Sequence, residues 1–272
     1  LSRSASSLET SIARLSSGLR VNSAKDDAAG LAIAERMTAQ IRGFDVAARN
    51  ANDGVSLLQV ADGALGKIGD NLQRMRELGV QAKNGTLNDT DRANLNREFT
   101  ELANEVGRVA TGTTFNGNNV FAAANKTVNL QIGSGNVASD TLAVNLTDTG
   151  AAAGNDLQTT LGGATQAAIV TAFGGVDTVA NATTAITEID TAINDITNLR
   201  ATTGASLSRL DQVVSSLETT SANLSSARGR IMDADFAKET ANLTRSQILQ
   251  QAGTAMLAQA NQLPNNVLSL LR

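Results

Sequence analysis

The longest regular pattern of apolar residues lies between Gly30 and Lys83. Its apolar residues recur at alternating steps of four and three, with one slip near Ala61; they are Met37, Ile41, Phe44, Ala48, Ala51, Val55, Leu58, Leu65, Ile68, Leu72, Met75 and Ala82. This spacing puts one apolar stripe on one side of an α-helix, as in a coiled coil. No proline interrupts it, so the pattern predicts a helix of about 50 residues, roughly 80 Å long. Such a helix cannot bury its stripe on itself and needs partners of similar length.

A matching pattern runs from Val179 to Ile231. The seam is imperfect, because its positions also include Arg200, Thr203, Ser221 and Arg228. Its apolar members are Ala182, Ile186, Ile189, Ile193, Ile196, Leu207, Leu210, Val214, Leu217, Leu224 and Ile231. We interpret it as a second helix of about 50 residues that supplies the buried face the first helix lacks.

Shorter elements lie between the two long helices. Asn88 or Asp89 is a suitable N-cap for a helix that ends near Thr111 and folds back antiparallel along the first. The segment Thr111–Phe121 is expected to be an irregular loop with an Asn-Gly turn. Alternating apolar residues in 127–146 predict a β-hairpin. Residues 147–178 are rich in Gly, Ala and Thr and predict a mobile, surface-exposed segment with one weak helix at 165–173.

Both ends of the chain carry short amphipathic patterns. A helix is predicted over 1–17, followed by a non-helical connector over 16–30. Near the other end, Ser225–Asp235 is expected to break the second long helix around Gly229, and Pro264 to kink or end the last helix. The order of elements along the chain is therefore mirrored about its middle.

These elements predict a mainly α fold, a long antiparallel helical rod or coiled-coil bundle built from both chain ends, with a small β-hairpin and a short variable middle. We expect three parts: residues 1–28 with 233–272, residues 29–146 with 179–232, and the exposed segment 147–178. One pair of short helices buries too little surface to be stable alone. The terminal helices therefore favour self-association, with a closed four-helix unit inside one monomer as the alternative. The residues expected to drive polymerisation are Leu8, Ile12, Leu15, Leu263, Val267, Leu270 and Leu271.

The amino-acid composition excludes most kinds of catalytic site. The chain has no Cys, His, Trp or Tyr, and Pro264 is its one proline. Without Cys or His, the usual nucleophile–base pairs and the common zinc, copper and haem sites are excluded. We predict no enzymatic activity, no cofactor and no metal. Asp26 and Asp27 are interpreted as the start of the long helix, where negative charge is favoured, with a metal or catalytic dyad as the alternative.

The charge is mild and dispersed, with a net value of −4. Nucleic acids and anionic membranes attract basic clusters, so neither is expected as a partner. No apolar run has the length of a membrane span, and no cleavable export signal opens the sequence.

Five motifs, in the same order, resemble bacterial flagellin, the subunit of the flagellar filament. They are LSSGLRVNSAKDDAAGLAI (Leu15–Ile33), IRGFDVAARNANDGVSLLQVADGAL (Ile41–Leu65), LQRMRELGVQ (Leu72–Gln81), TTFNG (Thr113–Gly117) and ANQLPNNVLSLLR (Ala260–Arg272). Flagellins usually carry further residues before the position of Leu1, so part of the innermost helix is expected to be absent here. The short middle implies a slim subunit without large outer domains.

The resemblance implies an extracellular structural protein that polymerises with itself for motility. Its terminal helices would form the inner tube of the filament, and its two long helices, the 90–111 helix and the hairpin would form the outer tube. Flagellins leave the cell unfolded by the flagellar type III route, so an export chaperone, the filament cap and the hook-junction proteins are implied partners.

The resemblance also implies a second role, as a ligand of the animal Toll-like flagellin receptor. The family's contact residues match Arg74, Leu78 and Glu98 here. An exposed Arg beside an apolar residue on a rigid helix suits a binding hot spot. The alternative is that Arg74 and Glu98 are solvated or intersubunit charges.

Other interpretations differ in specific residues. A hook–filament junction protein shares the terminal helices but not usually the LPNNVLSLLR ending, and a surface coiled-coil protein lacks the five motifs. A flagellin with a metalloprotease domain needs HExxH, which a chain without His excludes.

Overall fold

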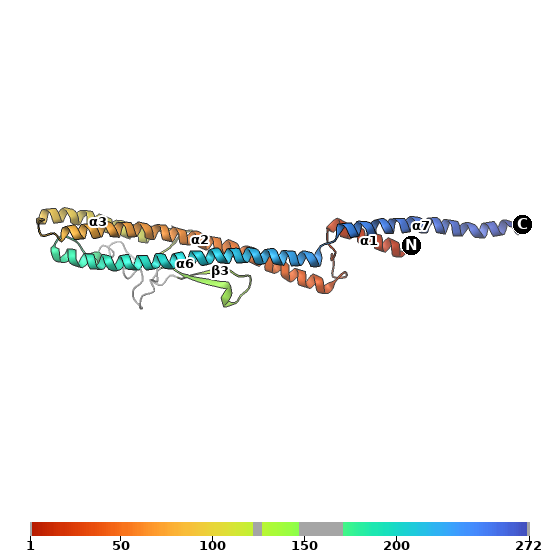
Figure 1. Ribbon diagram of the computed structural model, residues 1–272, viewed down its shortest axis with the longest axis horizontal. Helices are drawn as coiled ribbons and strands as arrows, with labels where there is room; N and C mark the ends of the chain where they lie inside the picture. The colour runs from red at the N-terminus through yellow and green to blue at the C-terminus, as the bar shows by residue number, and fades with distance from the viewer. Residues whose placement is uncertain (1, 122–126, 147–170, 271–272) are drawn as a thin grey trace. The chain divides into compact units, whose positions relative to one another are not determined.

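The computed structural model describes residues 2–121, 127–146 and 171–270 and is mainly helical (Figure 1). The elements in chain order are α1 (Ser2–Ser17), α2 (Ala28–Ala82), α3 (Asp89–Gly112), β1 (Thr114–Phe115), β2 (Asn118–Asn119), β3 (Thr127–Gln131), the short 3-10 helix η1 (Ala138–Asp140), β4 (Thr141–Asn145), α6 (Val179–Met232) and α7 (Phe236–Leu270). The predicted fold class is confirmed, including the two long helices and the hairpin. Most of the weak helix predicted at 165–173 lies outside the described residues.

The chain forms two compact units. One contains residues Leu1–Gly43 and Thr219–Arg272, and the other contains Phe44–Glu218. The first unit is therefore built from both ends of the chain, and α2 and α6 contribute residues to both units.

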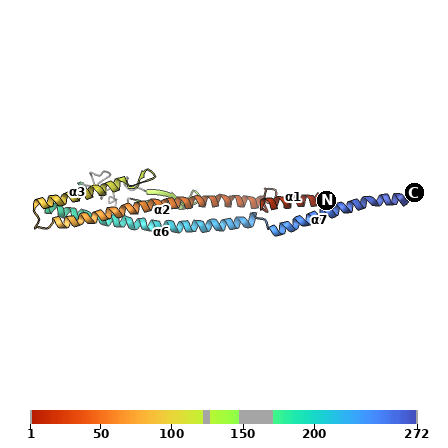
Figure 2. The ribbon, with the colours of Figure 1, turned by 90° about the horizontal axis from the view of Figure 1, so that it is seen from above.

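The core of the 44–218 unit lies between α2, α3 and α6, which run side by side in both views (Figures 1 and 2). The stripe predicted on α2 supplies much of it: the fully buried side chains include Leu58, Leu65, Ile68, Leu72 and Met75. Phe99 of α3 and Ile189 and Leu199 of α6 complete the same cluster. Burial of these stripes is the main stabilising contribution, since each fully buried Leu or Phe contributes about 1.5–3 kcal/mol.

The turn between α2 and α3 satisfies the ends of both helices. Asn88 accepts a hydrogen bond from the backbone N–H of Asp91, whose carboxylate accepts one from the N–H of Asn88, so the predicted N-cap is confirmed. Arg92 is buried and donates through Nε to the carbonyl of Ala82 and through Nη2 to that of Asn84. A cation at a helix C-terminus pairs with carbonyls that have no helical partner.

The β3–β4 hairpin is antiparallel, with Thr127 opposite Asn145 and Gln131 opposite Thr141. Its buried side is formed mainly by Leu142 and Val144. The side chain of Leu130 lies over Gly54 of α2, where an added Cβ would come within 2.3 Å of the Cδ1 atom of Leu130. Glycine at this position therefore lets the hairpin approach the helix closely.

The segment predicted as an irregular loop at 111–121 instead contains a small hairpin, β1–β2. The predicted Asn-Gly turn is confirmed: Asn116 and Gly117 both have positive φ, 50° and 77°. Positive φ at both central residues is the geometry of the tight hairpin turn that Asn-Gly favours. Strands of two residues are too short to show a period of two, which explains why the pattern missed them.

Arg200 does not lie in the seam of α6, contrary to the sequence prediction. Its side chain is exposed and donates through Nε to Asp62 of α2 at 2.8 Å, while the neighbouring Leu199 is fully buried. The position three residues after Ile196, rather than four, faces the core. The pairing with Asp62 raises the pKa of Arg200.

The interruption predicted within Ser225–Asp235 is observed at residues 233–235, between α6 and α7, and not at Gly229. α6 continues through Gly229 to Met232, and the carbonyl of Gly229 accepts a regular helical hydrogen bond from the N–H of Asp233 at 2.8 Å. One glycine costs a helix only about 1 kcal/mol, too little to end a long one. The helix α7 spans Phe236–Leu270 and therefore does not end at Pro264.

The chain enters α6 through a buried segment. Phe173 and Val176 belong to the core, and the side-chain oxygen of Asn96 on α3 accepts a hydrogen bond from the N–H of Val176 at 2.8 Å. The described end of the predicted surface segment 147–178 is thus held against α3, and residues 147–170 lie outside the described part of the chain.

Candidate functional site

The first candidate site is the pair of terminal helices α1 and α7, which lie side by side (Figures 1 and 2). Gly18 ends α1 with a φ of 72°, and its N–H bonds to the carbonyl of Arg14. A left-handed glycine is the common stop for a helix. The predicted connector then runs to Asp27, which caps α2 by accepting a hydrogen bond from the N–H of Gly30 at 2.8 Å.

The two connectors of this unit are joined by backbone hydrogen bonds. The N–H of Arg20 donates to the carbonyl of Met232, and the N–H of Ala234 donates to that of Gly18. The guanidinium of Arg20 also donates to the carbonyl of Ile231 at 2.6 Å, which satisfies a terminal carbonyl of α6. These bonds join two parts of the chain that are far apart in sequence, since Arg20 and Ile231 are separated by 211 residues.

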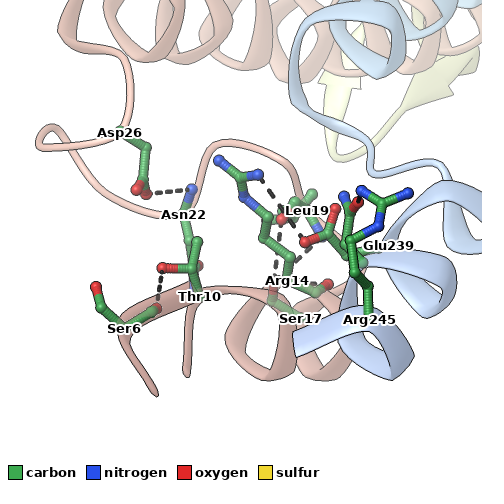
Figure 3. Close-up of polar contacts among 10 residues, drawn as sticks. Ser6, Thr10, Arg14, Ser17, Leu19, Asn22, Asp26, Glu239 and Arg245 are labelled. Carbon is green, nitrogen blue, oxygen red and sulfur yellow. Dashed lines mark hydrogen bonds and ion pairs between the residues drawn. The ribbon is translucent and has the colours of Figure 1, made fainter. Parts of the chain in front are cut away.

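The connector is closed by Asp26, whose carboxylate accepts a hydrogen bond from the N–H of Asn22 (Figure 3). The same carboxylate also accepts hydrogen bonds from the N–H and the hydroxyl of Ser23. The hydroxyl of Ser23, followed by the two N–H groups, lowers the pKa of Asp26. Asp26 and Asp27 therefore have separate local roles at the helix start, as interpreted from the sequence. Among the described residues, no group of three or more metal-ligating side chains comes together.

The contact between α1 and α7 is unusually polar. Its buried side chains include Ser11, Glu239 and Ser246, and Arg14 lies 4.0 Å from Glu239 (Figure 3). Large apolar side chains instead point to solvent: Ile12 is 51% exposed and Met256 is 69% exposed, and Phe236, Ile248, Leu249 and Leu257 are also exposed. An apolar surface of this kind on a small helical unit is typical of an interaction site.

The predicted polymerisation residues divide into three groups. Ile12 is exposed, while Leu8 and Leu15 are half-buried. Leu263, Val267 and Leu270 lie within α7, for which only the backbone is described at these positions, and Leu271 is outside the described residues. The sequence pattern did not single out Ile248 and Leu257, although both lie among the apolar residues of α7 and their exposure marks them as part of the same surface.

The second candidate site lies on the 44–218 unit, where α2 and α3 run side by side. Arg74 of α2 donates through Nε and Nη2 to Glu98 of α3, at 3.0 and 2.8 Å, and through Nη1 to Glu77 at 2.9 Å. Hydrogen bonding to Glu98, and then to Glu77, raises the pKa of Arg74. All three side chains are about half exposed or more, so the structure brings Arg74 and Glu98 together at the surface.

Leu78 matches a receptor-contact position in the sequence, but its side chain is not at the surface. It is only 1% exposed and belongs to the core between the helices, one turn after Arg74. Arg76 lies on another side of α2 and donates through Nε to Asp190 of α6 at 2.6 Å. The exposed part of this site is therefore the charged group of Arg74, Glu77 and Glu98.

No helix within the described ranges is both long enough and apolar enough to cross a membrane. The two long helices and the exposed apolar residues of α1 and α7 define the class of the protein: a mainly helical protein that presents an apolar surface suited to association.

Comparison with known proteins gives the family. Residues 1–126 match the bacterial flagellin N-terminal helical region, and residues 186–271 match the bacterial flagellin C-terminal helical region. The chain is 44% identical over 261 residues to a flagellin of Halalkalibacterium halodurans, covering 95% of this chain and 90% of that one. It is 40% identical over 299 residues to the flagellin of Bacillus subtilis, covering 100% and 95%. The chain belongs to the bacterial flagellin family.

Solved structures agree with this result. The crystal structure of Bacillus cereus flagellin matches 62% of this chain and 88% of its own, at 36% identity and a TM-score of 0.50. A putative flagellar hook-associated protein of Vibrio parahaemolyticus matches with a TM-score of 0.61 at 13% identity, covering 76% of this chain and all of its own, which shows a shared fold only. The protein is a non-enzymatic structural subunit of the extracellular flagellar filament and serves motility, as predicted.

Proposed function

We propose that the α1–α7 pair is the main polymerisation element of this filament subunit, and that it forms the inner tube while the long helices and the hairpin form the outer tube. The observation that supports this proposal is the exposure of Ile12, Ile248, Leu249, Met256 and Leu257 on two paired helices. Neighbouring copies in a filament would remove these side chains from water, and burial of such side chains is the dominant driving force for association.

The test is assembly by variants of the whole protein in a bacterium that lacks its own flagellin. Ile12→Asp and Leu270→Asp are expected to abolish sedimentable filaments, because each places an unpaired charge in an apolar contact. The conservative change Ile12→Leu is the control and should assemble. Circular dichroism of the purified subunits should show an unchanged cooperative unfolding of the 44–218 unit. Normal filaments from both Asp variants would contradict the proposal.

We also propose that the surface around Arg74 and Glu98 binds the animal Toll-like flagellin receptor. Arg74 is held by two carboxylates on a rigid helix pair, so little side-chain entropy is lost when a partner binds it. Because Leu78 is buried, its role in this proposal is to set the packing of α2 beneath Arg74.

The receptor proposal is tested with purified protein on reporter cells that express the receptor. Arg74→Ala is expected to weaken signalling at least tenfold, as truncation of a hot-spot residue typically costs about 2 kcal/mol or more. Arg97→Ala, an exposed arginine of α3 that contacts only Asn94 among the bonds described, is the matched control. Equal potency of both variants would reject the proposal.

Export through the flagellar type III route, with an export chaperone, the filament cap and hook-junction proteins as partners, completes the proposed function. Its support is the flagellin family membership of both chain ends. Co-purification of the unassembled subunit with the chaperone, and loss of secretion in a strain that lacks the export apparatus, would test it.

A further inference from the structure

A polar hollow lies between α1 and α7, in the unit formed by the two chain ends. It has a volume of about 510 Å³ and is lined on the α1 side mainly by serines, by Thr10 and by Arg14, and on the α7 side by Glu239, Asn242, Arg245, Ser246 and Leu249. Paired helices normally fill the space between them with apolar side chains at high density. A hollow of this size with hydroxyl and charged walls is therefore not explained by packing.

Arg14 is the least satisfied group in the hollow. Its Nε atom is buried and has no hydrogen-bond acceptor in the part of the chain that the structure describes. Its Nη1 atom is 4.0 Å from Glu239, which is an ion pair but too long for a hydrogen bond. A buried donor without an acceptor costs about 1–3 kcal/mol, so such a group calls for a partner that the isolated chain does not supply.

The lining of the hollow has an excess of one positive charge. Its cations are Arg14 and Arg245, and its single acid is Glu239 (Figure 3). Arg245 has a weak contact with Asn242 at 3.5 Å, so its guanidinium is largely free to receive another group. Guanidinium groups bind carboxylates through two parallel hydrogen bonds, and the Nε edge of Arg14 is one such pair of donors.

We propose that the Arg14–Arg245 hollow receives a carboxylate side chain from a second copy of this chain in the filament. This proposal rests on the role of the α1–α7 pair in polymerisation. The two helices that enclose the hollow also carry exposed apolar residues, Ile12 on α1 and Leu249 on α7, and Leu249 lines the hollow itself. A neighbour that covers them would exclude water from the hollow and strengthen the pairing. The net charge of −4 means that carboxylates outnumber cations on the neighbour.

The partner is identified by zero-length cross-linking in assembled filaments. Arg245→Lys supplies a primary amine, and a carbodiimide joins that amine to a carboxylate in contact with it, forming an amide bond with net loss of one water. Arg36→Lys, at an exposed arginine of α2 away from the hollow, is the matched control. Both variants are made in the whole protein, and filaments are collected by sedimentation before the reaction.

The expected result is a covalent dimer in Arg245→Lys filaments, with a cross-linked peptide that joins residue 245 of one copy to an Asp or Glu of another. Isotope-mixed filaments, grown from labelled and unlabelled subunits, distinguish this from a link within one chain. A link only to Glu239 of the same chain, or no dimer beyond that of Arg36→Lys, would overturn the proposal.

A second variant covers the case in which Arg245→Lys does not assemble. Arg14→Lys keeps the positive charge beside Glu239 but removes the Nε donor. The concentration of free subunit in equilibrium with filaments is expected to rise about tenfold, the effect of one charge-assisted hydrogen bond. An unchanged concentration would also overturn the proposal, whereas loss of assembly by Ile12→Asp bears only on the underlying polymerisation role.

Discussion

Arg92, in the first turn of α3, donates a hydrogen bond of 3.1 Å to the carbonyl of Ala82, the last residue of α2. The other unit contains a similar bond, from Arg20 to the carbonyl of Ile231 near the end of α6. In both places an arginine from a following or distant segment satisfies a carbonyl at the end of a long helix. The two helices of about 55 residues therefore end where an arginine from another segment satisfies one of their last carbonyls.

Replacement of Arg92 tests the first of these contacts. Arg92→Met keeps much of the buried aliphatic stem but removes the bonds to Ala82 and Asn84, so the free energy of unfolding should fall by about 2 kcal/mol. Urea denaturation followed by circular dichroism measures it. Arg97→Met, five residues later on the exposed side of the same helix, is the control and should change stability by less than about 0.5 kcal/mol. Equal effects would show that the carbonyl contact contributes little.

Replacement of two glycines of α2 by alanine should change the stability of the protein in opposite directions. Gly54→Ala places a methyl group too close to the Cδ1 atom of Leu130 and 3.3 Å from that of Leu210, so the Leu130 side chain must move out of its packed position and stability should fall by about 1–3 kcal/mol. At Gly66 no atom lies within 4 Å of the new Cβ, so Gly66→Ala should stabilise the helix by about 0.5–1 kcal/mol. Thermal unfolding of both variants checks the pair. A stabilised Gly54→Ala would mean that Leu130 is not held over α2.

The register of α6 against α2 is tested at two adjacent residues. Leu199→Ala should cost about 2–5 kcal/mol because Leu199 is fully buried, whereas Arg200→Ala should cost less than about 1 kcal/mol because the Asp62 pair is exposed. Chemical denaturation of both variants gives the comparison. A larger loss of stability in Arg200→Ala than in Leu199→Ala would instead support the seam expected from the sequence, in which position 200 faces the core.

Asp26 should make the N-terminal connector sensitive to acid. Its folded pKa is lowered by the bonds from Ser23 and Asn22, so the folded connector binds fewer protons than the unfolded one. The stabilising contribution is complete above the ordinary aspartate pKa of about 3.9 and is lost as the pH falls through the lower folded value. Protection of the amide hydrogens at residues 22–27, measured relative to the intrinsic exchange rate at each pH, should therefore fall below that value. Asp26→Asn should show low protection at every pH, and a wild-type protection that does not change across this range would refute the assignment.

Helix identity and length were predictable because the apolar stripes are long and uninterrupted. The helix predicted over 30–83 is observed over 28–82, and the Asn88 cap lies where the sequence suggested. The hairpin was equally clear, because Val128, Leu130, Leu142 and Val144 alternate along two short segments.

The seam near Ile196 was not predictable by spacing. Steps of three and four both continue a helical stripe, so Leu199 and Arg200 are equivalent until the facing surface of α2 selects one of them. Arg92 was missed for a related reason, since its acceptor is a carbonyl whose availability depends on where another helix ends. Likewise, Leu78 matched a contact motif, but only packing reveals that its side chain is buried.

Periodicity and local motifs were enough to predict the long helices, their apolar stripes, the terminal pattern that favours self-association and the family. Three features became visible only in the folded chain: which side of each helix is buried, which arginine satisfies which helix end, and the polar contact between α1 and α7, whose apolar residues face outward. These features depend on the relative position of residues far apart in the chain. Spacing fixes which residues share a face of a helix, but only the neighbouring helix decides which face is covered.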